Sequence, residues 1–587
     1  MLRQAAVNVA QLAAEWNLHP VQAHILAVRG FRHKREVESF LHASDMTLPS
    51  PTEFADMTRA LELVSEAIAA KQHIAIFGDY DADGIVSTVI LYKSLTMLNA
   101  NVTYYIPQRE SEGYGLNNEA IFALKQKQVE LIIACDNGVS AFEQVIYANS
   151  LGISVVILDH HDIPLTATGE QMLVPAAAIV DAKRQDCRYP FKLYCAAGVC
   201  YRFSEALYRY LGIDWSVLAE ELLPLAALAT ICDLVDLTGE NRALVQRGLP
   251  AIAASNNPGL AALRQATGVE GLEIGVYHVG FRLGPCVNAS GRLEDAALAV
   301  ELFLTDDAQR AMELAVYLAN LNNTRKALTE QGVNSALATI EQQNLAADKI
   351  ILVHCLDIYE SVAGIVAGKI KELYHKPIIV VAGNKEIVRG SARSIEAYNI
   401  YAGLSACSEL FINFGGHPMA SGFSIALSNV PLLRERLNQQ CALTQEDMQP
   451  LKRIDKLLPL HEASLKLAHE LRAFEPFGKG NPSIYFADTG LRLLKVSLLG
   501  QYKQVMRICL QSPGMAESVE AVCFDGKDKL QDLVISIWGE DTWRSLLSGR
   551  FMDIYLDILY TLNVNIYQGR QSAQIQIIDF RLASSKN

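Results

Sequence analysis

Several patterns that would quickly assign this sequence to a class are missing from it. Its 587 residues include eleven cysteines but no Cys-x-x-Cys pair, and neither a Gly-x-x-x-x-Gly-Lys-[Ser/Thr] nor a Gly-x-Ser-x-Gly motif. A Walker-type nucleotide hydrolase and a serine hydrolase are therefore disfavoured. Met1–Gln11 is too short and too polar for a secretory signal, and Asp233 and Asp236 interrupt the most apolar stretch, Leu222–Leu237. We expect a cytoplasmic protein with free thiols and no membrane segment.

The formal net charge of −13 argues against a uniformly basic nucleic-acid binder. The acidic surplus is unevenly distributed, because residues 444–587 hold 17 basic and 17 acidic side chains, whereas the preceding residues hold 34 and 47. Such a surplus is compatible with a solvated surface, and equally with carboxylates gathered around a divalent cation. Composition alone does not choose between the two.

The chain divides by pattern into five regions. Residues 1–70 have the periodicity of short helices. Residues 71–245 and 345–435 alternate short apolar runs with helical patterns, which predicts an α/β fold with parallel strands covered by helices. Residues 246–344 are mostly helical and are expected to join these two lobes, and residues 445–587 carry short strands typical of a small barrel or sandwich.

Acidic and imidazole residues follow several of the predicted strands. GDYDADG (78–84) comes directly after the apolar run HIAIF, and CDNGVS (135–140) and LDHHD (158–162) stand at two further strand ends. Asp233 interrupts an apolar run, where an unpaired charge is costly, so we expect a cation beside it. Because a parallel sheet places its site beyond the carboxyl ends of its strands, these clusters are expected to converge.

Each cluster taken alone also has an ordinary explanation. The segment DADG occurs in solvated turns, and a single histidine is more often a packed core residue than a ligand. Together they favour a metal site, because carboxylate oxygens with one imidazole suit Mn²⁺ or Mg²⁺ better than a thiolate site does. Two such ions in one cage would activate a water molecule and stabilise a phosphoryl displacement.

These motifs resemble the DHH phosphoesterase superfamily: GDYDADG, Asp136, the triplet 159–161 and Asp233 occur in the same order. Segments further along resemble its RecJ branch: GPCVNASGRLEDA (284–296), ESVAGIVAGKIKE (360–372), GSARS (390–394), FGGHPMASG (414–422) and EPFGKGNP (475–482). The resemblance runs from the first helices to the C-terminus. It implies a parallel-sheet DHH domain, a second α/β lobe of the DHHA1 type joined to it by helices, and a C-terminal OB-like β-barrel that binds oligonucleotides.

The resemblance also implies a function. RecJ proteins are metal-dependent exonucleases of DNA repair and recombination that degrade single-stranded DNA 5′→3′ to 5′ mononucleotides. We therefore expect two Mn²⁺ or Mg²⁺ ions, and single-stranded DNA, a helicase and a single-strand-binding protein as partners. The alternatives are a DHH phosphoesterase acting on short oligoribonucleotides or cyclic dinucleotides, and a catalytically silent replication or repair scaffold. An inorganic pyrophosphatase would share only the metal cage.

The resemblance assigns roles residue by residue. Six positions match metal ligands: Asp79, Asp81, Asp83, Asp136, His160 and Asp233. Asp136 and His161 are expected to act in the reaction, His161 through the phosphate or the attacking water. Eight positions are expected to contact the substrate: Arg109, Ser391, Arg393, Asn288, Arg292, Gly415, Gly416 and His417. Without the family context, the arginines would be surface cations and 414–417 a turn.

The chain departs from the family pattern at three places. Cys286 stands where an arginine is common, so one basic contact to the strand is missing unless Arg282 or Arg292 supplies it. Ile358-Tyr359 replaces a common Trp-His pair, and Phe77 occupies a position where some relatives have a metal-binding histidine. These changes leave the metal set intact and bear on substrate affinity and preference.

Overall fold

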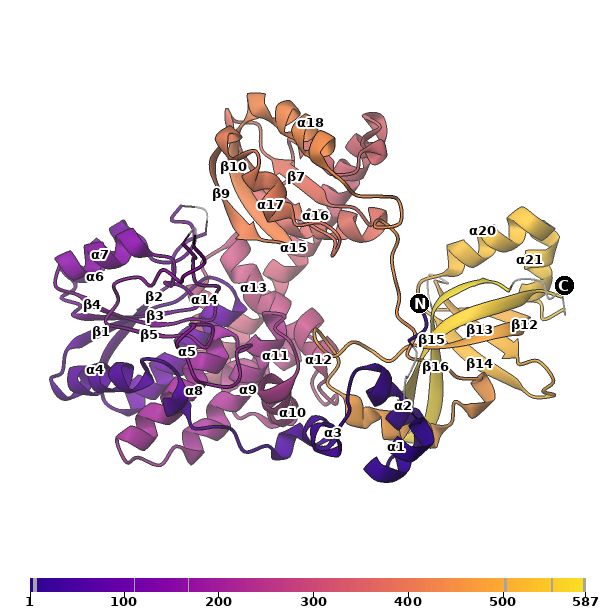
Figure 1. The fold of residues 1–587 in the computed structure, drawn as a ribbon, viewed down its shortest axis with the longest axis horizontal. Coiled ribbons are helices and arrows are strands. Elements are labelled where there is room, and N and C mark those ends of the chain that lie inside the picture. The colour runs from indigo at the N-terminus through magenta and orange to yellow at the C-terminus, as the bar shows by residue number, and fades with distance from the viewer. Residues whose placement is uncertain (4–7, 110, 167, 501–503, 551–552, 584–587) are drawn as a thin grey trace. The chain divides into compact units, whose positions relative to one another are not determined.

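The chain forms two compact units (Figure 1). The computed structural model describes residues 1–587 except 4–7, 110, 167, 501–503, 551–552 and 584–587. The first unit, here called the barrel unit, comprises Met1–Thr47, Asp236–Gln246 and Leu451–Asn587; the second, the two-lobe unit, comprises Leu48–Val235 and Arg247–Pro450. Over the described ranges, we find no helix with the length and apolar character needed to cross a bilayer.

The first lobe of the two-lobe unit is built on a five-stranded sheet in the order β2-β1-β3-β4-β5, with every pairing parallel. Its strands are β1 (His73–Phe77), β2 (Asn101–Tyr105), β3 (Leu131–Cys135), β4 (Ser154–Leu158) and β5 (Ala178–Val180). Its helices are α4 (Met57–Ala69), α5 (Ala82–Met97), α6 (Asn118–Gln126), α7 (Phe142–Ser150), α8 (Ala196–Tyr210) and α9 (Ser216–Cys232). The predicted α/β fold is confirmed here, although the short strand β5 was not foreseen.

The order of the strands indicates at which edge of this sheet a ligand would bind. The chain runs from β1 outward to β2 and then returns to β3 on the other side of β1, so the direction of winding changes between β1 and β3. Loops that leave two such strands diverge and open a crevice at their carboxyl ends, which is where doubly wound sheets bind ligands. The segments after β1 and β3 are GDYDADG and CDNG.

Helices connect the first lobe to the second. They are α10 (Gly239–Ala254), whose residues up to Gln246 belong to the barrel unit, α11 (Pro258–Ala266), α12 (Val276–His278), the π-helical turn η3 (Val279–Leu283), α13 (Gly284–Leu293), α14 (Ala297–Leu304) and α15 (Ala308–Gln342). Helix α13 lies against the GDYDADG loop, because a Cβ atom on Gly291 would stand 1.9 Å from the carbonyl oxygen of Tyr80. Glycine at 291 is therefore required for this close approach.

The second lobe has a mixed sheet in the order β6-β7-β8-β10-β9. Its elements are β6 (Ile351–Cys355), α16 (Glu360–Tyr374), β7 (Ile378–Ala382), β8 (Ile387–Arg393), α17 (Ile400–Ser405), β9 (Phe411–His417), β10 (Ala420–Ala426) and α18 (Val430–Gln440). Only β6 and β7 pair in parallel. Gly415, Gly416 and His417, expected in a substrate loop, instead form the end of edge strand β9, where they pair with β10.

The barrel unit confirms the predicted C-terminal barrel. Five strands close on themselves through the antiparallel pair β12–β15 and the parallel pair β14–β16. They are β12 (Phe486–Leu499), β13 (Val505–Gln511), β14 (Ser518–Cys523), β15 (Tyr555–Tyr567) and β16 (Arg570–Leu582), with β11 (Lys456–Leu457) alongside β12. Two helices between β14 and β15 were not predicted: α20 (Lys527–Trp538) and α21 (Glu540–Leu547).

Helices from the beginning of the chain complete the core of the barrel unit. They are α1 (Val9–Trp16), α2 (Pro20–Val28) and α3 (Lys34–Leu41), and α19 (Leu465–Leu471) joins them from the C-terminal part. Ile25, Leu26 and Val37 pack in the same hydrophobic cluster as barrel residues such as Phe486 and Tyr560. The N-terminal helices are therefore part of the barrel's core.

A buried arginine connects separate segments of the barrel unit. Arg242, in the first half of α10, is fully buried, and its side chain lies with its guanidinium carbon 4.0 Å from the ring centre of Phe40. Its donors reach five carbonyl oxygens: Phe40 (2.7 Å), Phe474 (3.0 Å), Pro476 (3.3 Å), Ala473 (3.0 Å) and Glu475 (2.7 Å). Every donor of the guanidinium therefore has a backbone acceptor.

Candidate active site

Four neighbouring strands of the first lobe each end in a buried aspartate. Asp79 follows β1, Asp136 follows β3, Asp159 follows β4 and Asp181 follows β5, with exposed fractions of 2%, 3%, 0% and 0%. Because these strands are parallel, the four carboxyl groups gather at one edge of the sheet. The expected convergence of the acidic clusters thus has a simple geometric origin.

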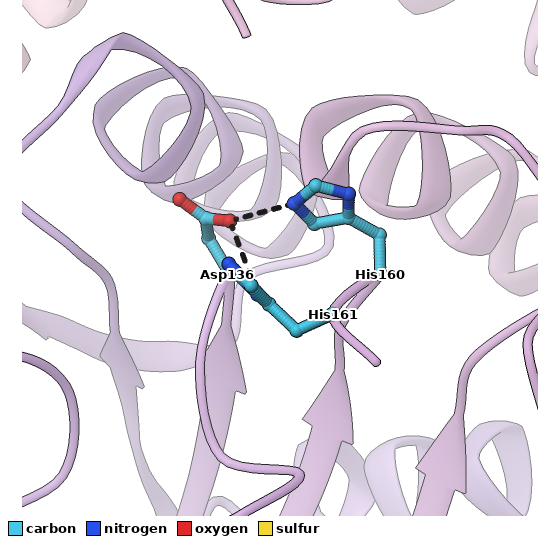
Figure 2. Close-up of side chains that lie close together, drawn as sticks. All are labelled: Asp136, His160 and His161. Carbon is cyan, nitrogen blue, oxygen red and sulfur yellow. Dashed lines mark ion pairs between the residues drawn. The ribbon is translucent and has the colours of Figure 1, made fainter. Parts of the chain in front are cut away.

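His160 lies at the centre of this edge. Its Nε2 atom is 3.3 Å from Asp136 Oδ1, 3.7 Å from Asp83 Oδ2 and 3.8 Å from Asp233 Oδ2. Figure 2 shows Asp136 directed toward His160 and His161 together, and His161 Nδ1 is 4.0 Å from the same oxygen. Asp233, at the C-terminal end of α9, thereby joins the strand-end residues from a helix.

The six predicted metal ligands all lie in this cluster. Their ligand atoms form three overlapping groups, within each of which the atoms are at most 4.8 Å apart. The groups are Asp136, His160 and His161; Asp83, His160 and Asp233; and Asp79, Asp81 and Asp136. Since Asp136 and His160 each belong to two groups, the donors form one continuous cage of carboxylate oxygens and imidazole nitrogens.

The aspartates of GDYDADG are held by local hydrogen bonds. Asp81 caps the N-terminus of α5, because its Oδ1 accepts from the backbone N–H groups of Asp83 and Gly84 at 2.9 and 3.2 Å. Asp83 instead accepts from the backbone N–H groups of Ala196 and Ala197, at the start of α8. The carboxylate of Asp83 therefore has a structural role as well as a place in the cage.

Asn288, expected to contact the substrate, holds the GDYDADG loop in the structure. Its Oδ1 accepts a hydrogen bond from the backbone N–H of Ala82 at 2.9 Å, in the middle of the GDYDADG loop. Asn288 thus fixes the loop from which three of the cage carboxylates arise. Its described contact is with this backbone.

The carboxylates of the cage lie close enough to disfavour one another's ionisation. Burial raises the pKa of Asp136 well above its ordinary value, and the nearby charges of Asp83 and Asp81 raise it further. Burial and Asp81 raise the pKa of Asp79 in the same direction. Among the described residues, Asp79 Oδ1 and His160 Nε2 are buried without a hydrogen-bond partner. Buried oxygen and nitrogen donors with this unmet demand fit a hard divalent cation.

The two histidines of the triplet differ in charge. Burial, aided by the neighbouring His161, lowers the pKa of His160 to about 3, so that its ring is neutral and can act as a ligand. Burial also opposes protonation of His161, but Asp159 outweighs it and raises the pKa of His161 to about 9. The cause is the 2.8 Å bond from His161 Nδ1 to Asp159 Oδ1. Asp159 therefore favours the protonated form of His161.

Some residues of the site were not assigned a role from the sequence. Asp159 accepts from the backbone N–H groups of Val139, His160 and His161 and from the ring of His161. Tyr114 donates its hydroxyl hydrogen to the carbonyl oxygen of Asp136 at 2.6 Å and lies 3.4 Å from both ring nitrogens of His161. The signal for Asp159 was its place as the first residue after a buried strand.

Beside the acidic cage lies a group of arginines. The guanidinium of Arg109 stands 4.2 Å above the ring of Tyr80, inside GDYDADG. Arg292 donates to the carbonyl oxygen of Ser361 at 2.9 Å and so connects α13 with α16 of the second lobe. Burial lowers the pKa of Arg292 to about 10, and the charges of Arg109, Arg325 and Arg393 add to this. The guanidinium groups of Arg109, Arg325 and Arg393 are thus close enough to Arg292 to disfavour its charge.

The remaining predicted substrate residues come from the second lobe. Ser391 and Arg393 of β8 face α16, since a Cβ atom on Gly364 would stand 2.8 Å from Ser391 Oγ and 2.6 Å from Arg393 Nη2. His417 Nδ1, at the end of β9, is 4.0 Å from Asp162 Oδ2, which directly follows the Asp-His-His triplet. For Gly415 and Gly416 the described contacts are strand pairing.

Known protein families match the three folded parts of the chain. The models of the DHH family N-terminal domain, the DHHA1 domain and the RecJ OB domain match residues 73–230, 348–443 and 454–579. The chain is 35% identical to the single-stranded-DNA-specific exonuclease RecJ of Bacillus subtilis over 542 residues, covering 91% of this chain and 67% of that protein. It is 31% identical to the protein of the same name from Haemophilus influenzae, covering 96% of both.

A solved structure has the same architecture over the whole chain. The crystal structure of RecJ from Thermus thermophilus in complex with Mn²⁺ superposes with a TM-score of 0.80 at 26% identity, covering 100% of this chain and 80% of that one. A parallel sheet whose strand ends surround an Asp-His-His triplet, followed by a DHHA1 lobe, defines a protein of the DHH class. With the RecJ OB domain and near full-length relatives, the chain belongs to the RecJ family, as its motifs indicated.

Proposed function

We propose that this chain is a divalent-metal-dependent exonuclease that degrades single-stranded DNA from the 5′ end to 5′ mononucleotides. The proposal rests on one observation: a cage of crowded carboxylates lies beside a group of arginines. The first arrangement suits divalent cations, and the second suits a phosphate of the substrate. The names of the RecJ relatives, single-stranded-DNA-specific exonucleases, support the same reading.

The metal would be Mn²⁺ or Mg²⁺, and the overlapping donor groups leave room for two ions. The residues that would hold them are Asp79, Asp81, Asp83, Asp136, His160 and Asp233. When bound, such ions supply positive charge that offsets the carboxylates, activate water and stabilise the phosphoryl oxygens.

The chain's own residues would orient the phosphodiester. Arg109 and Arg393 would hold the terminal phosphate by charge-assisted hydrogen bonds, which a guanidinium makes through two parallel donors. His161, whose Nδ1–H is committed to Asp159, would present its Nε2–H to a phosphoryl oxygen. A protonated ring placed in advance favours the charge that develops there during displacement.

The OB-like barrel would follow the strand beyond the cleaved end, as such barrels do through stacking and basic grooves. A nuclease limited to single strands depends on other proteins to open a duplex. A helicase and a single-strand-binding protein are therefore the partner classes that belong to this proposal.

The direct test uses purified protein with Mn²⁺ or Mg²⁺ on matched single-stranded DNA and RNA, each labelled at one end. We expect mononucleotides from the 5′ end of long DNA, and a loss of more than about 100-fold in rate for Asp136→Ala, because removal of a ligand exceeds the usual cost of losing an outer-shell partner. Cleavage confined to RNA or to fragments of a few nucleotides would favour a short-oligonucleotide phosphoesterase. Binding without cleavage under all conditions would favour a scaffold.

A further inference from the structure

Arg325, on the long helix α15, belongs to the arginine group but to none of the sequence motifs. Its Nε–H donates to Asn322 Oδ1 at 3.0 Å, one turn earlier on the helix. The buried Asn322 in turn donates from Nδ2 to the sulfur of Cys286 on α13 at 3.5 Å. Arg325 is therefore connected, through one neutral amide, to the position where the sequence lacks an expected cation.

The guanidinium of Arg325 keeps its charge and its terminal donors available. Its hydrogen bond uses only Nε, and within the described ranges no carboxylate forms an ion pair with Arg325, nor with Arg109, Arg292 or Arg393. The other arginine of α15, Arg310, differs in this respect, because it forms an ion pair with Glu301 at 2.7 Å. A half-buried guanidinium that is held by an amide, and that lies close enough to Arg292 to lower its pKa, has the properties of an anion-binding group.

The two residues expected to replace the missing cation are less suited to it. Arg292 already donates to the carbonyl oxygen of Ser361, which fixes one of its terminal nitrogens between the lobes. Arg282 lies in the π-helical turn η3, where its side chain is exposed. Cys286 does contact Arg282, but through its backbone, since the thiol donates to the Arg282 carbonyl oxygen at 3.2 Å. The side chain of Arg325 is connected to residue 286 through the buried Asn322.

We propose that Arg325 binds a phosphate of the substrate strand from α15, at the place that Cys286 leaves without a positive charge. This inference rests on the proposed function, because it assigns a specificity-determining residue to the same site. The fork of the two Nη groups supplies two parallel donors to one phosphate, while the Asn322 amide sets the direction of the fork without neutralising it. Cys286 accepts from Nδ2 of this amide, and the Oδ1 atom remains to accept from Arg325.

The test measures binding of a single-stranded oligonucleotide to full-length protein in the Asp136→Ala background, so that the strand stays intact. Arg325→Gln should weaken binding about tenfold, the value of one charge-assisted contact. The slope of log affinity against log salt should become shallower by about 0.7, because one phosphate contact fewer is neutralised. Arg310→Gln, on the same helix, serves as the matched control and should leave the slope unchanged.

A second variant separates binding from structure. Adding Cys286→Arg to Arg325→Gln returns a guanidinium to the same region and should restore both the affinity and the salt slope. An unchanged salt slope in Arg325→Gln would overturn the proposal. A loss of affinity that comes with a fall in thermal stability and that Cys286→Arg does not restore would overturn it as well. Normal binding by a wild-type protein that never cleaves DNA would count against the proposed exonuclease and leave the role of Arg325 standing.

Discussion

The two units of this chain treat buried charge in opposite ways. In the barrel unit, the guanidinium of Arg242 is fully buried, and five backbone carbonyls accept its hydrogen bonds. In the two-lobe unit, Asp79 and Asp136 are almost as deeply buried, yet their nearest charged neighbours include further carboxylates. The donors of the first site all have acceptors within its own unit, whereas the second site gathers like charges, which are those that we propose bind cations.

This difference separates structural from functional charge. A buried ion whose hydrogen-bonding capacity is met by the backbone stabilises the local fold, since removing it leaves several acceptors without donors. A cluster of like charges destabilises the fold unless a ligand binds, so its presence indicates a binding function. Asp159 shows that position alone is not decisive, because the acceptors of this strand-end carboxylate are met by three backbone N–H groups and His161.

The largest effect is expected from Arg242→Met. The substitution keeps much of the apolar contact with Phe40 but leaves the five carbonyl oxygens without their donors. The free energy of unfolding should fall by roughly 3–5 kcal/mol, as measured by urea denaturation. The exposed Lys34→Met in the same unit is the control and should change it by less than about 0.5 kcal/mol. A loss as small as the control's would show that water replaces the guanidinium, and that Arg242 is not the structural counterpart described here.

The acidic cage of the two-lobe unit could be predicted from the sequence, but the buried arginine of the barrel unit could not. The strand-end aspartates were recognisable because a parallel sheet brings the ends of separate strands to one edge. Arg242 gave no such signal, since its five acceptors come from Phe40 and Ala473–Pro476, far away in the chain. Any residue can supply a backbone carbonyl oxygen, so no sequence motif reveals these acceptors.

The same limit explains the other differences between expectation and structure. Glycines 415 and 416 indicated a loop, whereas pairing with β10 makes them the end of a strand, which tertiary context decides. Asn288 was assigned to the substrate by its motif, and its hydrogen bond with the backbone of Ala82 had no signal in the sequence. Helices α20 and α21 lie between strands whose apolar alternation dominated the pattern of that region.

The next largest effect is expected from Asp181→Asn. This substitution tests whether a buried carboxyl group with an unpartnered oxygen always belongs to the functional site. Asp181 accepts from the backbone N–H of Lys183 through Oδ1, while its Oδ2 is buried without a described partner. Burial, with the charge of Asp159, raises the pKa of Asp181 from 3.8 to about 7. Ionisation is therefore harder in the folded state, and stability is lost as the pH rises from about 4 through 7.

Removing that carboxyl should stabilise the protein by roughly 2–4 kcal/mol at pH 8, with a gain that shrinks toward zero near pH 4. Thermal denaturation across this range measures the gain, and the exposed Asp306→Asn supplies a baseline. Retained nuclease activity would place Asp181 outside the functional cluster. If activity disappears along with the carboxyl, the cluster extends one strand further than the six proposed ligands.

The smallest effect concerns how precisely the acidic cage is positioned. Asn288→Ala removes the acceptor of the Ala82 N–H and loosens the loop that carries Asp79, Asp81 and Asp83. Loss of such an outer-shell partner lowers metal affinity by about 10–100-fold, which calorimetric titration with Mn²⁺ measures directly. Asn288→Asp keeps an acceptor at this position and should recover most of the affinity, while the exposed Asn323→Ala should change nothing.

The decisive feature of this last prediction is its dependence on metal concentration. If Asn288 acts through the loop, saturating Mn²⁺ restores the rate of Asn288→Ala while the KM for DNA stays close to that of the wild type. If Asn288 touches the strand, as its motif suggested, the KM rises and no amount of metal corrects it. The first result would sharpen the comparison between the two units. The acidic cage would then depend on cations and also on a precisely held loop, whereas Arg242 depends on the backbone around it.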